Sequence, residues 1–125
     1  TFDIRVTRPN MEPVLNTAEI HTIEHIGATF LRNHTTYSSS IIYFGPMGCR
    51  TGFYLVMGGD LASDQVANLV REMFECIATF TGDVPGASQI ECGNYLDINL
   101  DMAKFAAKKY IKNVLDNLNE DTLIY

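Results

Sequence analysis

The stretch SSSIIYFGPMGCRTGFYLVM, residues 38–57, decides the predicted fold. Its two ends, at 38–44 and 52–57, are rich in β-branched and aromatic residues, which favour strands. Between them, the residues GPMGCRTG at 45–52 combine glycines with a proline, which is typical of a tight loop. The stretch therefore predicts a strand, a loop and a second strand, with Cys49 on the loop or at the edge of the second strand.

The residues before this hairpin predict one more strand and a helix. Residues 1–7 alternate apolar and polar side chains, as a half-buried strand does, and Arg5 lies on the polar face. Asn16 followed by Glu19 resembles a capping box and predicts the start of a helix that continues to about Asn33. The predicted core face of this helix consists of Ile20, Ile23, Gly27, Phe30 and Leu31.

The residues after the hairpin predict two more helices separated by a loop. Apolar residues recur at helical spacing over 63–80 and again from Asp101 onward. The segment 81–94 holds Pro85 and several glycines and small polar residues, so we expect a loop that carries Cys92. Together these elements predict an α+β fold, in which an antiparallel β-sheet packs against α-helices in a single two-layer domain.

Composition limits the possible functions. The chain has 125 residues and a mass of 14.0 kDa, is 46% hydrophobic and 19% charged, and so fits one globular domain. Its net charge of -6 repels phosphate groups, so nucleic acids and anionic membranes are not expected partners. No apolar run is long enough to cross a bilayer, and the first residues given lack the basic-then-apolar pattern of a signal peptide. Three cysteines suit a reducing compartment, so we expect a cytoplasmic protein.

The stretch IHTIEH, residues 20–25, is the first candidate site. On a helix, His21, Glu24 and His25 share one face, which is rotated away from the predicted core face. Two imidazoles four residues apart can bind one cation, and Glu24 is near enough to move protons without binding the metal. The pattern is short, and two surface histidines beside a carboxylate remain an equal alternative.

A catalytic metal usually needs a third protein ligand, and the spacing leaves its identity open. His34 lies too far along the predicted helix, whereas Cys49 and Cys92 both lie in predicted loops. Cys49 is followed by Arg50, so we expect loop amides and a guanidinium to stabilise a thiolate there. Cys76 falls in an apolar stripe and is interpreted as a small buried hydrophobic residue.

Four blocks of the sequence, taken together, resemble the S-ribosylhomocysteine lyase family and occur in that family's order. These blocks are FDIRVTRPN at 2–10, HTIEH at 21–25, GPMGCRTGFYL at 45–55 and ECGN at 91–94. The resemblance implies cleavage of the thioether of S-ribosylhomocysteine to L-homocysteine and 4,5-dihydroxy-2,3-pentanedione, the autoinducer-2 precursor used in quorum sensing. In the family, two successive carbonyl migrations precede a β-elimination.

The resemblance also implies the cofactor and the assembly. It assigns one divalent metal per subunit to His21, His25 and Cys92, with Fe(II) as the native ion and Zn(II) or Co(II) as possible substitutes. It further implies a homodimer with two active sites at the subunit interface.

For the chemistry, the resemblance assigns acid and base roles to Glu24 and Cys49. Arg5 matches the arginine of the family's FDIR block and is expected to contact the substrate. We expect the same of Arg50, because it follows Cys49.

The sequence departs from the family pattern in two places. Because the chain begins at Thr1 without a methionine, we expect that the family's N-terminal segment is missing from residues 1–125. Tyr43 and Gly45 stand where many family members have an aspartate and a serine, so a carboxylate near the sugar is lost.

Two other functions remain as alternatives. The pattern H-x-x-E-H also occurs in zinc metallopeptidases, for which Glu72 or Glu75 would be the third ligand. A non-catalytic metal-binding module would use the same histidines with a closed coordination sphere.

Overall fold

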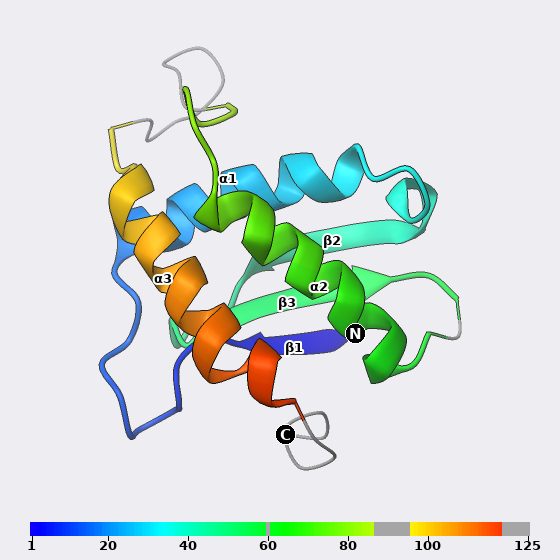
Figure 1. Cartoon of the computed structure of the whole chain (residues 1–125), viewed down its shortest axis with the longest axis horizontal. Helices are drawn as coiled ribbons and strands as arrows, with labels where there is room; N and C mark the ends of the chain where they lie inside the picture. Colours follow the sequence, from blue (N-terminus) through cyan, green and yellow to red (C-terminus); the bar gives the residue numbers. More distant parts are fainter. Residues whose placement is uncertain (60, 87–95, 119–125) are drawn as a thin grey trace.

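The hairpin at 38–57 forms the centre of the sheet. In the computed structural model, which describes residues 1–59, 61–86 and 96–118, β2 (Ile41–Pro46) turns back into β3 (Gly52–Met57). The strand β1 (Phe2–Arg5) pairs with the other side of β3, so the antiparallel sheet has the order β1-β3-β2 (Figure 1). The predicted α+β class is confirmed.

Two predicted strands are shorter than expected. The strand expected from residue 38 begins at Ile41, because Ser38–Ser40 form a 3-10 turn in which the Ser40 amide donates to the Tyr37 carbonyl at 2.9 Å. Serine competes for backbone hydrogen bonds in this way and favours turns. β1 ends at Arg5, because the amides of Val6 and Thr7 both donate to the Thr51 carbonyl and interrupt the ladder.

The three predicted helices are confirmed as α1 (Thr17–Arg32), α2 (Ser63–Ala78) and α3 (Leu100–Asn113). The predicted capping box is present at the start of α1. The Asn16 side chain accepts from the Glu19 amide at 2.9 Å, and the Glu19 carboxylate accepts from the Asn16 amide at 2.7 Å. Both of these amides would otherwise lack a partner, so the box fixes where α1 begins.

The core lies between one face of the sheet and the helices. Figure 1 shows α2 and α3 crossing in front of the sheet while α1 runs beside β2. Four residues of the predicted α1 face are buried, Phe30 is half-buried, and Thr22 and Ile26, which the prediction omitted, are also buried. At Gly27 an added Cβ would lie 2.8 Å from the Phe44 ring of β2, so a glycine lets α1 pack closely against the sheet.

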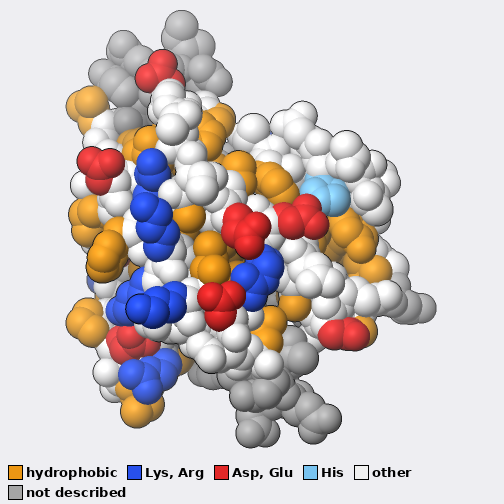
Figure 2. Space-filling model, viewed as in Figure 1, with side chains coloured by type: hydrophobic (Ala, Val, Ile, Leu, Met, Phe, Trp, Pro, Cys, Tyr) orange, Lys and Arg blue, Asp and Glu red, His pale blue; other side chains and the backbone are white. Residues whose placement is uncertain are grey.

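The surface carries both acidic and basic side chains, which come from 15 Asp and Glu and 9 Lys and Arg in the sequence. Figure 2 shows basic side chains running over α3 with acidic side chains interspersed among them. Within the residues that the structure describes, no helix combines the length and the apolar character needed to span a bilayer.

Candidate active site

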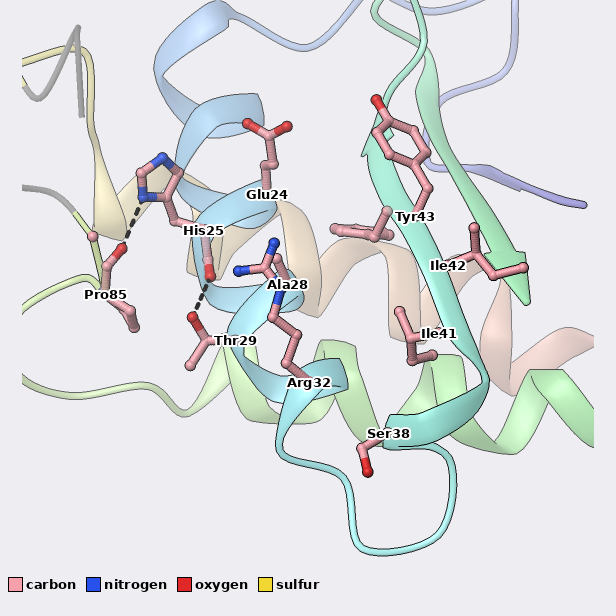
Figure 3. A pocket seen from close by; sticks show the side chains of 12 residues that line it. Glu24, His25, Ala28, Thr29, Arg32, Ser38, Ile41, Ile42, Tyr43 and Pro85 are labelled. Carbon is pink, nitrogen blue, oxygen red and sulfur yellow. Dashed lines mark hydrogen bonds between the residues drawn. The ribbon is translucent and has the colours of Figure 1, made fainter. Parts of the chain in front are cut away.

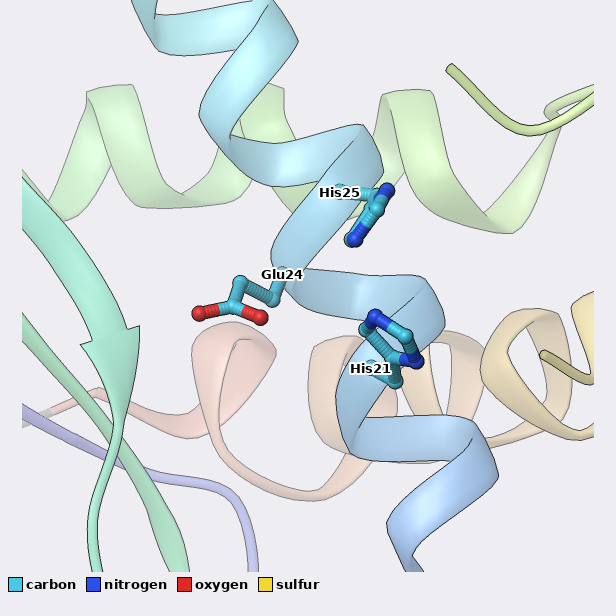
Figure 4. A group of neighbouring side chains, drawn as sticks. All are labelled: His21, Glu24 and His25. Atoms are coloured by element: carbon cyan, nitrogen blue, oxygen red, sulfur yellow. The ribbon is translucent and has the colours of Figure 1, made fainter. Parts of the chain in front are cut away.

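The first cluster of candidate side chains lies on α1. His21, Glu24 and His25 are half-buried, and each can offer a ligand atom within 4.8 Å of the others. The two imidazole rings meet edge to face, with centroids 4.5 Å apart. Figure 4 shows the two imidazole rings next to each other on α1, with the Glu24 carboxylate beside them and directed toward the strands. The predicted face is therefore confirmed as a compact group of two nitrogen donors and one carboxylate.

Each histidine is oriented by a backbone carbonyl from a distant loop. His21 Nδ1 lies 2.9 Å from the Asp97 oxygen, and His25 Nδ1 lies 2.8 Å from the Pro85 oxygen. A carbonyl oxygen can only accept, so Nδ1 carries the proton and the lone pair of the neutral ring is on Nε2. Histidines that bind metals are held in this way, so the donor set fits a divalent cation.

Thr22 attaches the Asp97 loop to α1 from inside the core. Its side chain is fully buried, donates to the Ala18 carbonyl at 2.7 Å and accepts the Asn99 amide at 2.9 Å. Asn99 also caps α3, and its side chain accepts from the Met102 amide at 3.0 Å. One hydroxyl therefore links α1, the start of α3 and the carbonyl that orients His21.

Replacing Thr22 with valine should lower the free energy of unfolding by about 1–3 kcal/mol, because the partly buried Asn99 amide loses its acceptor. Thr22→Ser keeps the hydroxyl and serves as the matched control. Urea unfolding of both variants beside the wild type measures the effect. A Thr22→Val protein that unfolds at the wild-type urea midpoint would refute this role for the hydroxyl.

The predicted third metal ligand, Cys92, lies outside the described residues. The acidic residues that a peptidase would use are engaged elsewhere. Glu72 accepts from His34 Nε2 at 3.0 Å, and Glu75 lies 3.8 Å from Arg71. Within the described part of the chain, neither glutamate belongs to the cluster on α1, which weakens the metallopeptidase alternative.

The second cluster lies at the end of the hairpin and joins β1 to the loop. Arg5 Nη1 donates to the Thr51 hydroxyl at 2.7 Å and lies 3.7 Å from Cys49 Sγ. The Thr51 hydroxyl in turn lies 3.1 Å from Cys49 Sγ. A thiolate cannot donate, so in that state Thr51 donates to the sulfur while it accepts from Arg5. The predicted position of Cys49 on the loop is confirmed.

These contacts lower the pKa of the Cys49 thiol below its usual value. The main causes are the hydrogen bonds from the Thr51 hydroxyl and the Thr51 amide, with a smaller contribution from the Arg5 guanidinium. The expected loop amide is therefore confirmed, but Arg50 is not among the causes. Arg50 is exposed and has a left-handed backbone conformation with φ of 60°. Thr51 was missed, and its only sequence signal is its position two residues after the cysteine.

Alkylation of Cys49 should therefore begin at lower pH than that of an ordinary thiol, and Thr51→Val should move the midpoint to higher pH. Thr51→Ser retains the hydroxyl and should behave as the wild type. Burial raises the pKa of Cys76, so that thiol provides a slowly reacting internal reference. Iodoacetamide labelling followed by peptide mass spectrometry resolves the two sites, and identical midpoints for Thr51→Val and the wild type would contradict the assignment.

A pocket of about 680 Å³ opens between α1 and β2 and includes part of the α1 cluster. Glu24, His25 and Arg32 line one wall, and Tyr43 lines the opposite wall (Figure 3). Among the described residues, the Glu24 carboxylate has no hydrogen-bond or ion-pair partner. Cys49 is not among the lining residues, so the two clusters lie at different places on the chain.

Comparisons with known proteins give the family of this chain. The family described as S-Ribosylhomocysteinase (LuxS) matches residues 1–121. A protein named S-ribosylhomocysteine lyase from Clostridium acetobutylicum is 62% identical over 125 residues, which cover all of this chain and 78% of that protein. Proteins of the same name from Clostridium beijerinckii and Finegoldia magna are each 56% identical over 125 residues, covering 79% and 78% of their lengths. That name denotes a carbon–sulfur lyase, and this chain belongs to the S-ribosylhomocysteinase family.

Proposed function

We propose that this protein cleaves the thioether of S-ribosyl-L-homocysteine, giving L-homocysteine and 4,5-dihydroxy-2,3-pentanedione. The observation that carries the proposal is the α1 cluster, where two histidines with fixed tautomers lie beside a carboxylate that faces a pocket. Family membership supplies the substrate, since the relatives carry the name of this lyase.

A divalent metal is the cofactor in this proposal, and His21, His25 and Cys92 would bind it. Nitrogen and thiolate donors suit Fe(II), the expected native ion, as well as Zn(II) or Co(II). When bound, such an ion acts as a Lewis acid toward carbonyl and hydroxyl oxygens of the substrate. The carbonyls of Asp97 and Pro85 hold the two imidazoles in the orientation that binding needs.

Glu24 and Cys49 perform the proton transfers in this proposal. The C–S bond can break by elimination only after the sugar carbonyl has moved from C1 to C3. In each migration a base removes the proton from the carbon beside the carbonyl, and an acid returns a proton to the former carbonyl carbon. A final proton removal at C4 expels homocysteine thiolate from C5. Cys49 has the lowered pKa that a thiolate base requires, and Glu24 carries out the proton transfer in the elimination.

Arg5 and Arg50 are proposed to contact the substrate. Arg5 is half-buried, and its Nη1 lies close to Cys49 Sγ and donates to the Thr51 hydroxyl. A substrate oxygen near Cys49 is therefore within reach of this guanidinium. Arg50 is exposed beside Cys49, where its guanidinium can approach the substrate from solvent.

We further propose a homodimer in the cytoplasm with active sites at the subunit interface. Ile4 is buried on the helix side of β1, so its neighbours Asp3 and Arg5, which form an ion pair at 3.7 Å, project from the opposite face. The α1 cluster lies on the helix side. In this arrangement Cys49 and Arg5 of one subunit complete the site that contains Glu24 of the other. Ile42, which is exposed on β2, supplies apolar surface for the contact.

Product analysis tests the proposed function. The metal-loaded protein should convert S-ribosylhomocysteine to homocysteine and the dione in equal amounts, measured by a thiol reagent and by mass spectrometry. A mixed peptide library should remain intact under the same conditions. Peptide cleavage without thiol release would instead favour the metallopeptidase, and stoichiometric metal with neither activity would favour a non-catalytic module.

A further inference from the structure

The side chain of Tyr43 occupies an unusual position over the backbone of β2. Tyr43 and Gly45 lie two residues apart on the strand and therefore on the same face. A Cβ added to Gly45 would collide with the hydroxyl oxygen and the ζ carbon of Tyr43. The ring thus lies along the strand and places its hydroxyl beside Gly45, next to the loop that carries Cys49. The absent side chain of Gly45 provides the space.

The Tyr43 hydroxyl is available to a ligand. The residue is 51% exposed, and its hydroxyl has no hydrogen-bond partner among the described residues. It lines the same pocket as Glu24, and Figure 3 shows these two side chains at the same end of that pocket, one on α1 and one on β2. A neutral phenol both donates and accepts a hydrogen bond, which suits an alcohol group.

We infer that Tyr43 is a substrate-binding residue whose phenol hydroxyl hydrogen-bonds to a hydroxyl group of the sugar chain. The inference rests on the proposed function, because it names a contact within the site that Glu24 faces. Gly45 acts indirectly, since it only allows the ring to reach this position. A hydrogen bond that is equally strong in the bound substrate and in the transition state strengthens substrate binding without accelerating the chemical steps.

Substitutions test the contribution of the Tyr43 hydroxyl apart from that of the ring. Tyr43→Phe should raise KM for S-ribosylhomocysteine about 2- to 10-fold and leave kcat and the unfolding midpoint unchanged. Tyr54→Phe removes an exposed phenol from the neighbouring strand β3, outside the lining of the pocket, and should match the wild type. Gly45→Ala alone should raise KM for the same substrate. When it is combined with Tyr43→Phe, it should have little further effect on KM.

Analogues distinguish a direct contact from a structural role. Dissociation constants are measured by calorimetry in the inactive Cys49→Ala background for S-ribosylhomocysteine and for analogues that each lack one sugar hydroxyl. Tyr43→Phe should weaken binding of all of these ligands except the one that lacks the partner hydroxyl. An unchanged KM, or an equal loss with every analogue, would overturn the inference. A wild type that neither binds nor cleaves S-ribosylhomocysteine would instead overturn the proposed function, and the inference with it.

Discussion

Replacing His25 with alanine is expected to remove the bound metal and abolish thiol release. The variant loses one of two imidazoles that the structure orients toward a shared site, and metal affinity should fall by more than about 100-fold. Metal content is measured by elemental analysis after equilibration with a competing chelator. Thiol release is followed on the same samples.

His34→Ala is the matched control for this prediction. His34 follows the same helix, but its ring contacts Glu72 and the amides of Thr36 and Tyr37 instead of the α1 cluster. The variant should keep a full complement of metal. Equal metal content in His25→Ala and His34→Ala would show that the α1 cluster does not hold the ion.

Glu24→Gln and Cys49→Ala should each lose activity by about 10²- to 10⁴-fold while metal remains bound. Glutamine keeps the size of Glu24 but cannot take a proton, and alanine removes the thiolate that Thr51 and Arg5 stabilise. Thiol release and metal content together measure the effect. Wild-type turnover by either variant would exclude that residue from the proton transfers.

Mixing the two inactive variants tests the composite site. If Glu24 and Cys49 of one site come from different subunits, random exchange gives half mixed dimers, each with one intact site. Activity should then return to about a quarter of the wild-type value. If both residues act within one chain, no mixture of these variants recovers activity.

The sequence allowed accurate predictions where the determining interactions are local. The capping box of Asn16 and Glu19 fixed the start of α1, and the spacing of His21, Glu24 and His25 placed them on one helix face. Both features depend on residues within four positions of one another. The predicted extents of β1 and β2 were wrong, because the amides of Val6 and Thr7 share the Thr51 carbonyl and the serines before β2 form a turn.

Features that depend on tertiary structure were not predictable. Arg5 meets Thr51 and Cys49 only because β1 pairs with β3 and places Arg5 opposite Gly52. Gly52 is required there, since an added Cβ would collide with the Ile4 backbone. The carbonyls that orient the histidines come from distant loops and leave no side-chain signal in the sequence.

Titration of metal into the metal-free protein tests the central claim most directly. The protein is prepared anaerobically with a chelator, and Fe(II) is added stepwise in the presence of saturating S-ribosylhomocysteine while homocysteine is followed. The account predicts no thiol release without metal. As Fe(II) is added, the initial rate of thiol release should rise linearly and reach a plateau at about one ion per chain. Thiol release by the metal-free protein, or none at full metal occupancy, would contradict it.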